Sequence, residues 1–213
     1  LPTTIFESMG FSYLGPVNGH DTEHLIMLLQ KAKQMDKPVV LHVMTQKGRG
    51  YLPAEKSPSK YHGVGKFNPE IGVASSSSMT FSDAFGAEMC RLAAREPKLC
   101  AITAAMADGT GLTPFAKEFP KRFFDVGIAE GHAVTFSAGL AAAGSRPFCN
   151  IYSSFMQRAY DNVIHDVALQ NLPVVLCLDR AGLVGEDGAT HHGAFDIAYF
   201  SCVPNLTIAA PRN

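Results

Sequence analysis

The first part of the chain alternates apolar runs with one amphipathic stretch. Two short apolar runs, residues 11–15 (FSYLG) and 37–44 (KPVVLHVM), are typical of strands. Between them, residues 18–34 carry apolar side chains at helical spacing, which predicts a helix that Asp21 caps. A strand, a helix and a strand in this order form a β-α-β unit, which indicates a parallel sheet.

A second alternating series follows a polar stretch. Pro, Gly, Ser and Lys are frequent over 50–79, and VASSSSM (73–79) is typical of a linker, so we predict a domain boundary near residue 75. After it, helices are predicted at 82–95, near 113–119, at 130–143 and at 153–170, and strands at 99–104, 123–127, 147–152, 173–179 and 205–210. Short apolar strands that alternate with helices indicate an α/β fold with doubly wound, mostly parallel sheets.

Ligands bind such sheets beyond the carboxyl ends of the strands, which directs attention to the segments that follow each strand. Five of these segments carry polar groups: TQKGRG (45–50), TAAMADGTG (103–111), GIAEGH (127–132), YSSFMQR (152–158) and DRAGLVGEDGATHHGAFD (179–196). Each signal is weak alone, but five on one chain predict a functional site.

Composition and charge narrow the class of protein. Hydrophobic residues make up 46% and charged residues 17%, which is typical of a folded α/β protein. The net charge of −1 gives no indication of a nucleic-acid or membrane-surface partner, and no apolar run of about 18 residues predicts a transmembrane helix. Five scattered cysteines without a CxxC pair indicate reduced, buried thiols in a cytoplasmic protein, and a cysteine nucleophile is the less favoured alternative. The first residues, LPTTIFESMG, and the last, NLTIAAPRN, suggest a piece of a longer polypeptide.

Glu130 places a carboxylate where an apolar strand gives way to an apolar helix. Such a group costs free energy unless something pairs with it. At the start of a helix its charge also gains from the helix dipole. From the residues alone, both a plain N-terminal glutamate and a functional carboxylate remain open.

Four cationic or aromatic positions also leave a structural and a functional interpretation open. Arg180 ends a buried strand, where a guanidinium suits a phosphate group or forms a salt bridge with Asp179 or Asp187. Phe155 and Arg158 begin a helix, whose N–H groups favour anions, although a phenylalanine there is commonly part of the core. Lys47, in a glycine loop, suits a phosphate.

The segment 185–196 holds three acids, two histidines and three glycines. This composition is typical of a solvated turn. A zinc site is less favoured, because His191 and His192 are adjacent and their side chains diverge.

Several segments together resemble the 1-deoxy-D-xylulose-5-phosphate synthase family of transketolase-like enzymes. They are GPVNGHD (15–21), TQKGRGY (45–51), YHGVGKFNP (61–69), GIAEGHAVTFSAGLAAAG (127–144), NIYSSFMQRAYDNVIHDVALQNLPVVLCLDRAG (150–182) and GEDGATHHGAFD (185–196). The resemblance covers nearly the whole chain in order. It implies a thiamine-diphosphate-binding, transketolase-like fold, incomplete at both ends. Residues 1–74 would be the C-terminal part of the diphosphate-binding domain plus a linker, and 75–213 a truncated pyrimidine-binding domain.

The resemblance implies an enzyme that uses thiamine diphosphate and Mg²⁺ to condense pyruvate with D-glyceraldehyde 3-phosphate, with loss of CO₂. The product, 1-deoxy-D-xylulose 5-phosphate, would feed isoprenoid, thiamine and pyridoxal synthesis. The family also implies a cytoplasmic homodimer with no nucleic-acid or membrane partner. The alternatives are a transketolase, the β chain of a 2-oxoacid dehydrogenase, and a catalytically silent module of the same fold.

The resemblance also implies cofactor contacts. Glu130 would hold the pyrimidine nitrogen N1′, and Phe155 would stack on the pyrimidine ring. Arg158 would lie on the pyrimidine side. The bent cofactor shape would be enforced by Met106 and Ile128, and the diphosphate would meet Lys47.

Substrate contacts follow in the same way. His62 and His191 would lie near the reacting carbon and assist proton transfers. The phosphorylated aldehyde would be held by Tyr152, Arg180 and Asp187, with His191 beside it. The remaining histidines are interpreted as structural or incidental: His20, His24, His42, His132, His165 and His192.

Two features depart from the family pattern. Gly131 follows the key glutamate where the family pattern has Gln, which leaves the carboxylate role intact and changes the packing beside it. The chain also lacks the G-D-G motif and later Asn that bind Mg²⁺ in the family, so no metal ligand is expected in this chain. The resemblance also implies a third domain and a second phosphate-binding arginine, which we expect beyond Asn213.

Overall fold

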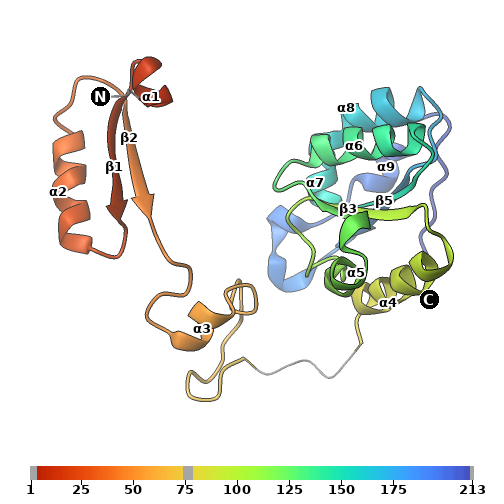
Figure 1. The fold of residues 1–213 in the computed structure, drawn as a ribbon, viewed down its shortest axis with the longest axis horizontal. Coiled ribbons are helices and arrows are strands. Elements are labelled where there is room, and N and C mark those ends of the chain that lie inside the picture. Colours follow the sequence, from red (N-terminus) through yellow and green to blue (C-terminus); the bar gives the residue numbers. More distant parts are fainter. Residues whose placement is uncertain (1–3, 74–78, 212–213) are drawn as a thin grey trace. The chain divides into compact units, whose positions relative to one another are not determined.

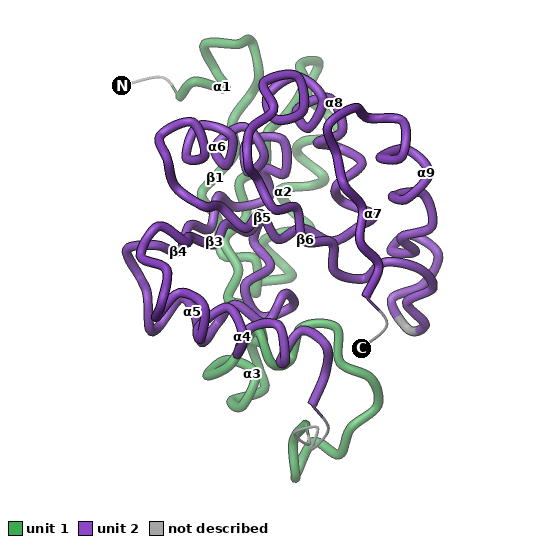
Figure 2. Tube along the Cα trace, turned by 90° about the vertical axis from the view of Figure 1, so that its right-hand side faces the viewer, with its two compact units in different colours: residues 1–76 green, residues 77–213 purple. Residues whose placement is uncertain are grey.

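The computed structural model describes residues 4–73 and 79–211. It divides into two compact units, residues 1–76 and residues 77–213, which are coloured separately in Figure 2. Most of the predicted linker over 73–79, and the boundary predicted near residue 75, lie outside the described residues.

Unit 1 is built on the predicted β-α-β unit. Strands β1 (Ser12–Asn18) and β2 (Val39–Met44) form a parallel pair, and helix α2 (Thr22–Ala32) connects them. The Asp21 carboxylate accepts a hydrogen bond from the backbone N–H of His24, so the predicted cap is confirmed. Two short helices complete the unit, α1 (Ile5–Ser8) and α3 (Leu52–Lys56).

Unit 2 contains a four-stranded parallel sheet in the order β4-β3-β5-β6. Its strands are β3 (Leu99–Thr103), β4 (Phe123–Asp125), β5 (Arg146–Tyr152) and β6 (Val175–Asp179). The chain proceeds from β3 to one side and then returns to the other side, as a doubly wound sheet does. The α/β prediction is therefore confirmed.

Helices cover both faces of this sheet (Figure 1). Helices α4 (Phe81–Arg95) and α5 (Thr113–Glu118) lie on one face, and α6 (Glu130–Ala142) lies on the other with α8 (Tyr160–Asn162). Because side chains alternate along a strand, Leu99 and Ala101 join the core under α4 and α5, and Cys100 and Ile102 join the core under α6.

A long-range hydrogen bond fastens the first helix of unit 2 to its last strand. Ser82, in the first turn of α4, donates from its Oγ to the Asp179 carboxylate at 2.9 Å. At the same helix, Gly86 and Gly111 allow backbone to approach backbone, since a Cβ on Gly86 would lie 1.9 Å from the Gly111 carbonyl oxygen.

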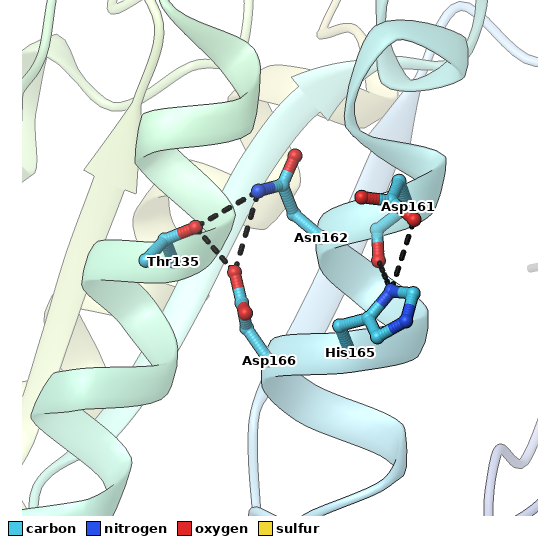
Figure 3. A network of polar contacts seen from close by, with 5 residues as sticks. All are labelled: Thr135, Asp161, Asn162, His165 and Asp166. Carbon is cyan, nitrogen blue, oxygen red and sulfur yellow. Dashed lines mark hydrogen bonds and ion pairs between the residues drawn. The ribbon is translucent and has the colours of Figure 1, made fainter.

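The helix predicted at 153–170 is interrupted. It consists of α7 (Ser153–Met156), a 3-10 helix (Gln157–Ala159), α8 and a π-helical turn (Val163–Ala168). On its α6 side, the amide of Asn162 donates to Thr135 and Asp166, and Thr135 also donates to Asp166 (Figure 3). Side-chain contacts with α6 therefore accompany the change of hydrogen-bond pattern, which apolar spacing does not encode.

The prediction of a strand at 205–210 is wrong. Asn205 has a left-handed backbone (φ 63°), and the residues that follow it have no strand partner in the described part of the chain. Helix α9 (Asp196–Phe200) and short 3-10 helices at Pro120–Arg122, Gly185–Asp187 and Ala189–His191 complete the unit. Over residues 4–73 and 79–211, no helix has the length and apolarity needed to cross a membrane.

The cysteine prediction holds only in part. Cys100 and Cys149 are buried, and burial raises the pKa of the Cys149 thiol to about 12. Cys202 is exposed, because it follows the short α9 and its thiol donates to the Tyr199 carbonyl at the surface.

Candidate active site

The carboxyl ends of the four parallel strands of unit 2 meet at one edge of the sheet. Thr103 is in register with Asp125 and with Asn150, and Tyr152 is in register with Asp179. The segments that leave these strand ends carry the predicted site residues of unit 2.

Glu130 has a charge partner 28 residues later in the chain. Arg158 donates from Nη1 to Glu130 Oε1 at 2.8 Å. Only 6% of the Glu130 side chain is exposed, whereas 61% of the Arg158 side chain is exposed. The ion pair and the N-terminal position in α6 together compensate a buried charge that would otherwise be costly. In the described residues no hydrogen bond involves the other carboxylate oxygen, Oε2.

Three side chains form an aromatic cluster: Tyr152 at the end of β5, Phe155 in α7, and His191 in the loop after β6. The rings of Tyr152 and Phe155 are stacked, with centroids 5.6 Å apart and planes 12° apart. His191 meets Phe155 edge-on at 5.5 Å, and the guanidinium of Arg158 lies 5.2 Å from the Phe155 ring centroid. Arg158 therefore connects Glu130 with the aromatic cluster, because its guanidinium contacts both Glu130 and Phe155.

Arg180 adds an anchored cation to this cluster. Its guanidinium pairs with Asp187 at 2.9 Å, the salt bridge that the sequence offered as one alternative, and lies 5.5 Å from the Tyr152 ring centroid. Burial raises the pKa of the Tyr152 hydroxyl, and the charge of Arg180 opposes this shift. Both partners of the salt bridge remain partly exposed, so an anion can reach the guanidinium.

Two further loops are tied together by a residue that the sequence analysis missed. Asp125 accepts hydrogen bonds at Oδ1 from the backbone N–H of Ala105 (2.8 Å) and of Gly127 (3.0 Å). These residues precede Met106 and Ile128, respectively. The sequence offered one signal for this role, an acidic residue at the end of a strand and two residues before a glycine.

Met106 approaches the aromatic cluster, and Ile128 does not contact it. A Cβ on Gly109 would lie 2.1 Å from the Tyr152 hydroxyl and 3.0 Å from Met106 Cε, so both side chains pack on that glycine. Ile128 is 84% exposed, which leaves its side chain available to a ligand.

Lys47 and His62 belong to unit 1, where both are exposed. Lys47 follows β2, and its loop is held by His20, whose Nε2 accepts from the Gln46 backbone N–H at 2.7 Å. A structural role for His20 agrees with its sequence interpretation. His192 is also engaged with the backbone, since its Nδ1 accepts from Val184.

The chemistry of this arrangement is specific. A buried carboxylate with one oxygen engaged, next to stacked aromatic rings, suits a heteroaromatic ring that carries a nitrogen donor. The Arg180 guanidinium suits a phosphate. Within the described residues, no group of three or more His, Cys, Asp or Glu side chains could hold a metal ion.

Comparison with known families matches both units. Residues 77–213 match the family described as transketolase, pyrimidine binding domain, and residues 1–45 match the family described as 1-deoxy-D-xylulose-5-phosphate synthase.

Curated relatives and solved structures are similar to the chain over much or all of its length. The 1-deoxy-D-xylulose-5-phosphate synthase of Oleidesulfovibrio alaskensis is 54% identical over 100% of the chain, and that of Clostridium acetobutylicum is 57% identical over 97% of it. The chain spans 34% of the length of each. The solved structure of the transketolase from Leishmania mexicana shares the fold, with a TM-score of 0.55 and 18% sequence identity. The match covers 93% of this chain and 42% of the transketolase chain.

Proposed function

The chain belongs to the family described as transketolase, pyrimidine binding domain, and we propose that it is part of a 1-deoxy-D-xylulose-5-phosphate synthase and carries the pyrimidine half of a thiamine-diphosphate site. The protein that contains it would condense pyruvate with D-glyceraldehyde 3-phosphate and release CO₂. The product would be 1-deoxy-D-xylulose 5-phosphate, a precursor for isoprenoid, thiamine and pyridoxal synthesis.

One observation carries this proposal: a buried carboxylate at the start of α6 next to an aromatic ring. Glu130 is 5% exposed, is charge-compensated by Arg158, and lies in a site whose aromatic member, Phe155, is contacted by the same guanidinium. A plain N-terminal glutamate needs no such arrangement. The residues present therefore fit the aminopyrimidine ring of the cofactor.

The residues of the chain divide the work on the cofactor. Thiamine diphosphate, when bound, supplies the nucleophilic carbon and the electron sink for decarboxylation, while the protein orients it and controls its charges. Glu130 Oε2 would accept a hydrogen bond from the pyrimidine nitrogen, and Phe155 would stack on the ring. Met106 and Ile128 would support the bent shape from the two loops that Asp125 ties together.

The substrate side is proposed from the Arg180 group. Arg180 would bind the phosphate of the aldehyde, and Asp187 and Tyr152 would hold the guanidinium in place. His191 would assist proton transfers from its edge-on position against Phe155. The exposed His62 and Lys47 of unit 1 are proposed for proton transfer and for the cofactor diphosphate.

A metal ion, an oligomeric state and a location complete the proposal. Mg²⁺ is proposed as the partner of the diphosphate, and residues 4–73 and 79–211 contain no group of three or more His, Cys, Asp or Glu side chains that could hold it. A cytoplasmic homodimer is proposed by analogy with the family.

Glu130→Gln in the full-length protein tests this function. Glutamine keeps the size of the side chain but removes the charge that compensates Arg158 and holds the ring nitrogen. Pyruvate consumption in the presence of thiamine diphosphate, Mg²⁺ and D-glyceraldehyde 3-phosphate should fall at least about 100-fold, the scale of losing one positioned acid–base group. Glu96→Gln, which removes the charge from a second Glu–Arg ion pair, formed with Arg146 at the start of β5, is the matched control.

The alternatives give different results in the same assay. A transketolase would not consume pyruvate, and a dehydrogenase chain would need a lipoyl partner to turn over. A silent module would show no activity in the wild-type protein and no effect of Glu130→Gln.

A further inference from the structure

Ser153 and Asp196 form a buried polar pair that none of the roles above uses. Ser153 is 1% exposed and Asp196 is 7% exposed. Ser153 donates from Oγ to Asp196 Oδ2 at 2.9 Å, and Asp196 Oδ1 accepts from the backbone N–H of Ile197 at 2.8 Å. No cation of the described residues forms a salt bridge with Asp196. Burying a carboxylate costs free energy, which two hydrogen bonds offset only in part. A group that is retained at this cost invites a functional explanation.

The pair lies at the base of the loop that carries Arg180 and His191. Gly182 and Gly193 exchange two backbone hydrogen bonds of 2.9 Å, which close this loop at its base. A Cβ on Gly193 would lie 2.4 Å from Ser153 Oγ and 2.7 Å from the Arg180 carbonyl oxygen. The side chain of Ser153 therefore packs directly against the closed base of the loop.

The same pair also involves the first residue of α7, the helix that contains Phe155. This residue is Ser153, which directly follows Tyr152. Asp196 begins α9, three residues after Gly193. The Ser153–Asp196 hydrogen bond thus connects the element that holds Phe155 with the end of the loop that holds His191.

We propose that Ser153 and Asp196 are positioning residues, which set the spacing between the Phe155 ring and the loop of Arg180 and His191. This inference rests on the proposed function, because the group that they position is the pyrimidine side of thiamine diphosphate. Neither residue needs to touch the cofactor. Their bond keeps the ring of Phe155 at a fixed place before the cofactor binds, which lowers the ordering cost of binding.

The test compares three variants of the full-length protein with a matched control. Ser153→Ala and Asp196→Ala remove the bond. In Asp196→Asn the amide can still accept from Ile197 and donate to Ser153, so the bond can be kept. Ser137→Ala is the control, because Ser137 is an equally buried serine whose Oγ donates within α6 to the Ala133 carbonyl.

We expect Ser153→Ala and Asp196→Ala to raise the Kd for thiamine diphosphate about tenfold, equivalent to about 1.4 kcal/mol, by calorimetric titration in the presence of Mg²⁺. Asp196→Asn and Ser137→Ala should stay within about twofold of the wild type. The Tm of each variant is measured without cofactor, so that stability and positioning are read separately.

The outcomes are distinct. If the wild type binds thiamine diphosphate and both alanine variants lower Tm without changing Kd, the pair is a structural tie and the positioning role is overturned. If the wild type binds no thiamine diphosphate, the proposed function falls first and the positioning role with it. If Asp196→Ala does not fold, Ser153→Ala decides, because it removes a single atom.

Discussion

The side-chain amide of Asn162 occupies the space into which a side chain of Gly131 would extend. A Cβ on Gly131 would lie 2.8 Å from Asn162 Oδ1. Gly131, next to Glu130, thus makes room for a residue that holds Thr135 and Asp166 (Figure 3). The absence of a side chain beside Glu130 therefore permits this close contact between α6 and α8.

Gly131→Ala should be coupled to Asn162. Alone, the substitution pushes the amide of Asn162 away from Thr135 and Asp166 and should lower the free energy of unfolding. With Asn162→Ala already present, the same substitution should be neutral or stabilising, because alanine favours a helix over glycine. A double-mutant cycle by urea unfolding should give a coupling energy of about 1 kcal/mol. Additive effects would mean that the two positions do not share this space.

Gly86→Ala should destabilise unit 2 strongly. The new Cβ would lie 1.9 Å from the Gly111 carbonyl oxygen, and backbone cannot move aside as a flexible side chain can. We expect a loss of about 2–3 kcal/mol, the scale of overpacking in a core. Gly139→Ala in α6 is the matched helical control, since no described atom beyond its chain neighbours and the backbone of its own helix lies within 4 Å of its Cβ position. It should stabilise the protein by up to about 1 kcal/mol, and equal effects at both sites would contradict the packing argument.

Asp125→Ala should weaken cofactor binding more than it weakens folding. It releases the N–H groups of Ala105 and Gly127, so the loops of Met106 and Ile128 are no longer held together. The Kd for thiamine diphosphate in the full-length protein should rise about tenfold, which corresponds to about 1.4 kcal/mol. Asp125→Asn keeps an acceptor oxygen at the same place and should bind nearly as the wild type does. An unchanged Kd in Asp125→Ala would remove the two loops from the cofactor site.

The stability of the chain should depend on pH through Asp179. Burial raises the pKa of this carboxyl, and the Ser82 hydrogen bond and the charge of Arg180 oppose the shift. A carboxyl with a raised folded pKa contributes stability below its unfolded pKa and loses it as the pH rises through the folded pKa.

Asp179→Asn keeps the acceptor for Ser82 and removes the charge. Its Tm should therefore exceed that of the wild type at about pH 7, and the difference should vanish as the pH falls toward about 4, near the ordinary carboxyl pKa. The exposed Asp36 provides the control, and Asp36→Asn should show no such convergence. A Tm difference that is constant with pH would refute the linkage.

Periodicity predicted the elements that local sequence controls. The start of α2 at Asp21, the buried stripe of α4 with Met89 and Ala93, and the strands of unit 2 follow directly from alternating or helical apolar spacing. The failures have a common physical origin. The π-helical turn after Asn162 accompanies side-chain contacts with α6, which the apolar pattern does not encode. The residues after Asn205 have strand-like spacing, but no neighbouring strand pairs with them in the described part of the chain.

The site shows the same division. The segments after the strands could be found because parallel strands place their carboxyl ends together. The pairing of Glu130 with Arg158, and of Asp125 with two backbone N–H groups, joins residues that only the folded chain brings together. The roles of Glu130, Phe155 and Arg180 came from the resemblance and remain proposals for experiment.

The hydrogen bond between Ser82 and Asp179 has a consequence for how unit 2 forms during synthesis. Its two partners are 97 residues apart, so the first helix of the unit leaves the ribosome long before its attachment point exists. Contacts of such high sequence separation slow folding, because the entropy of closing the loop is spent before the contact forms. The apolar stripe of α4 packs with residues of β3 and α5, which follow it closely in the chain, so α4 can dock early and the Ser82–Asp179 hydrogen bond closes only when β6 is complete.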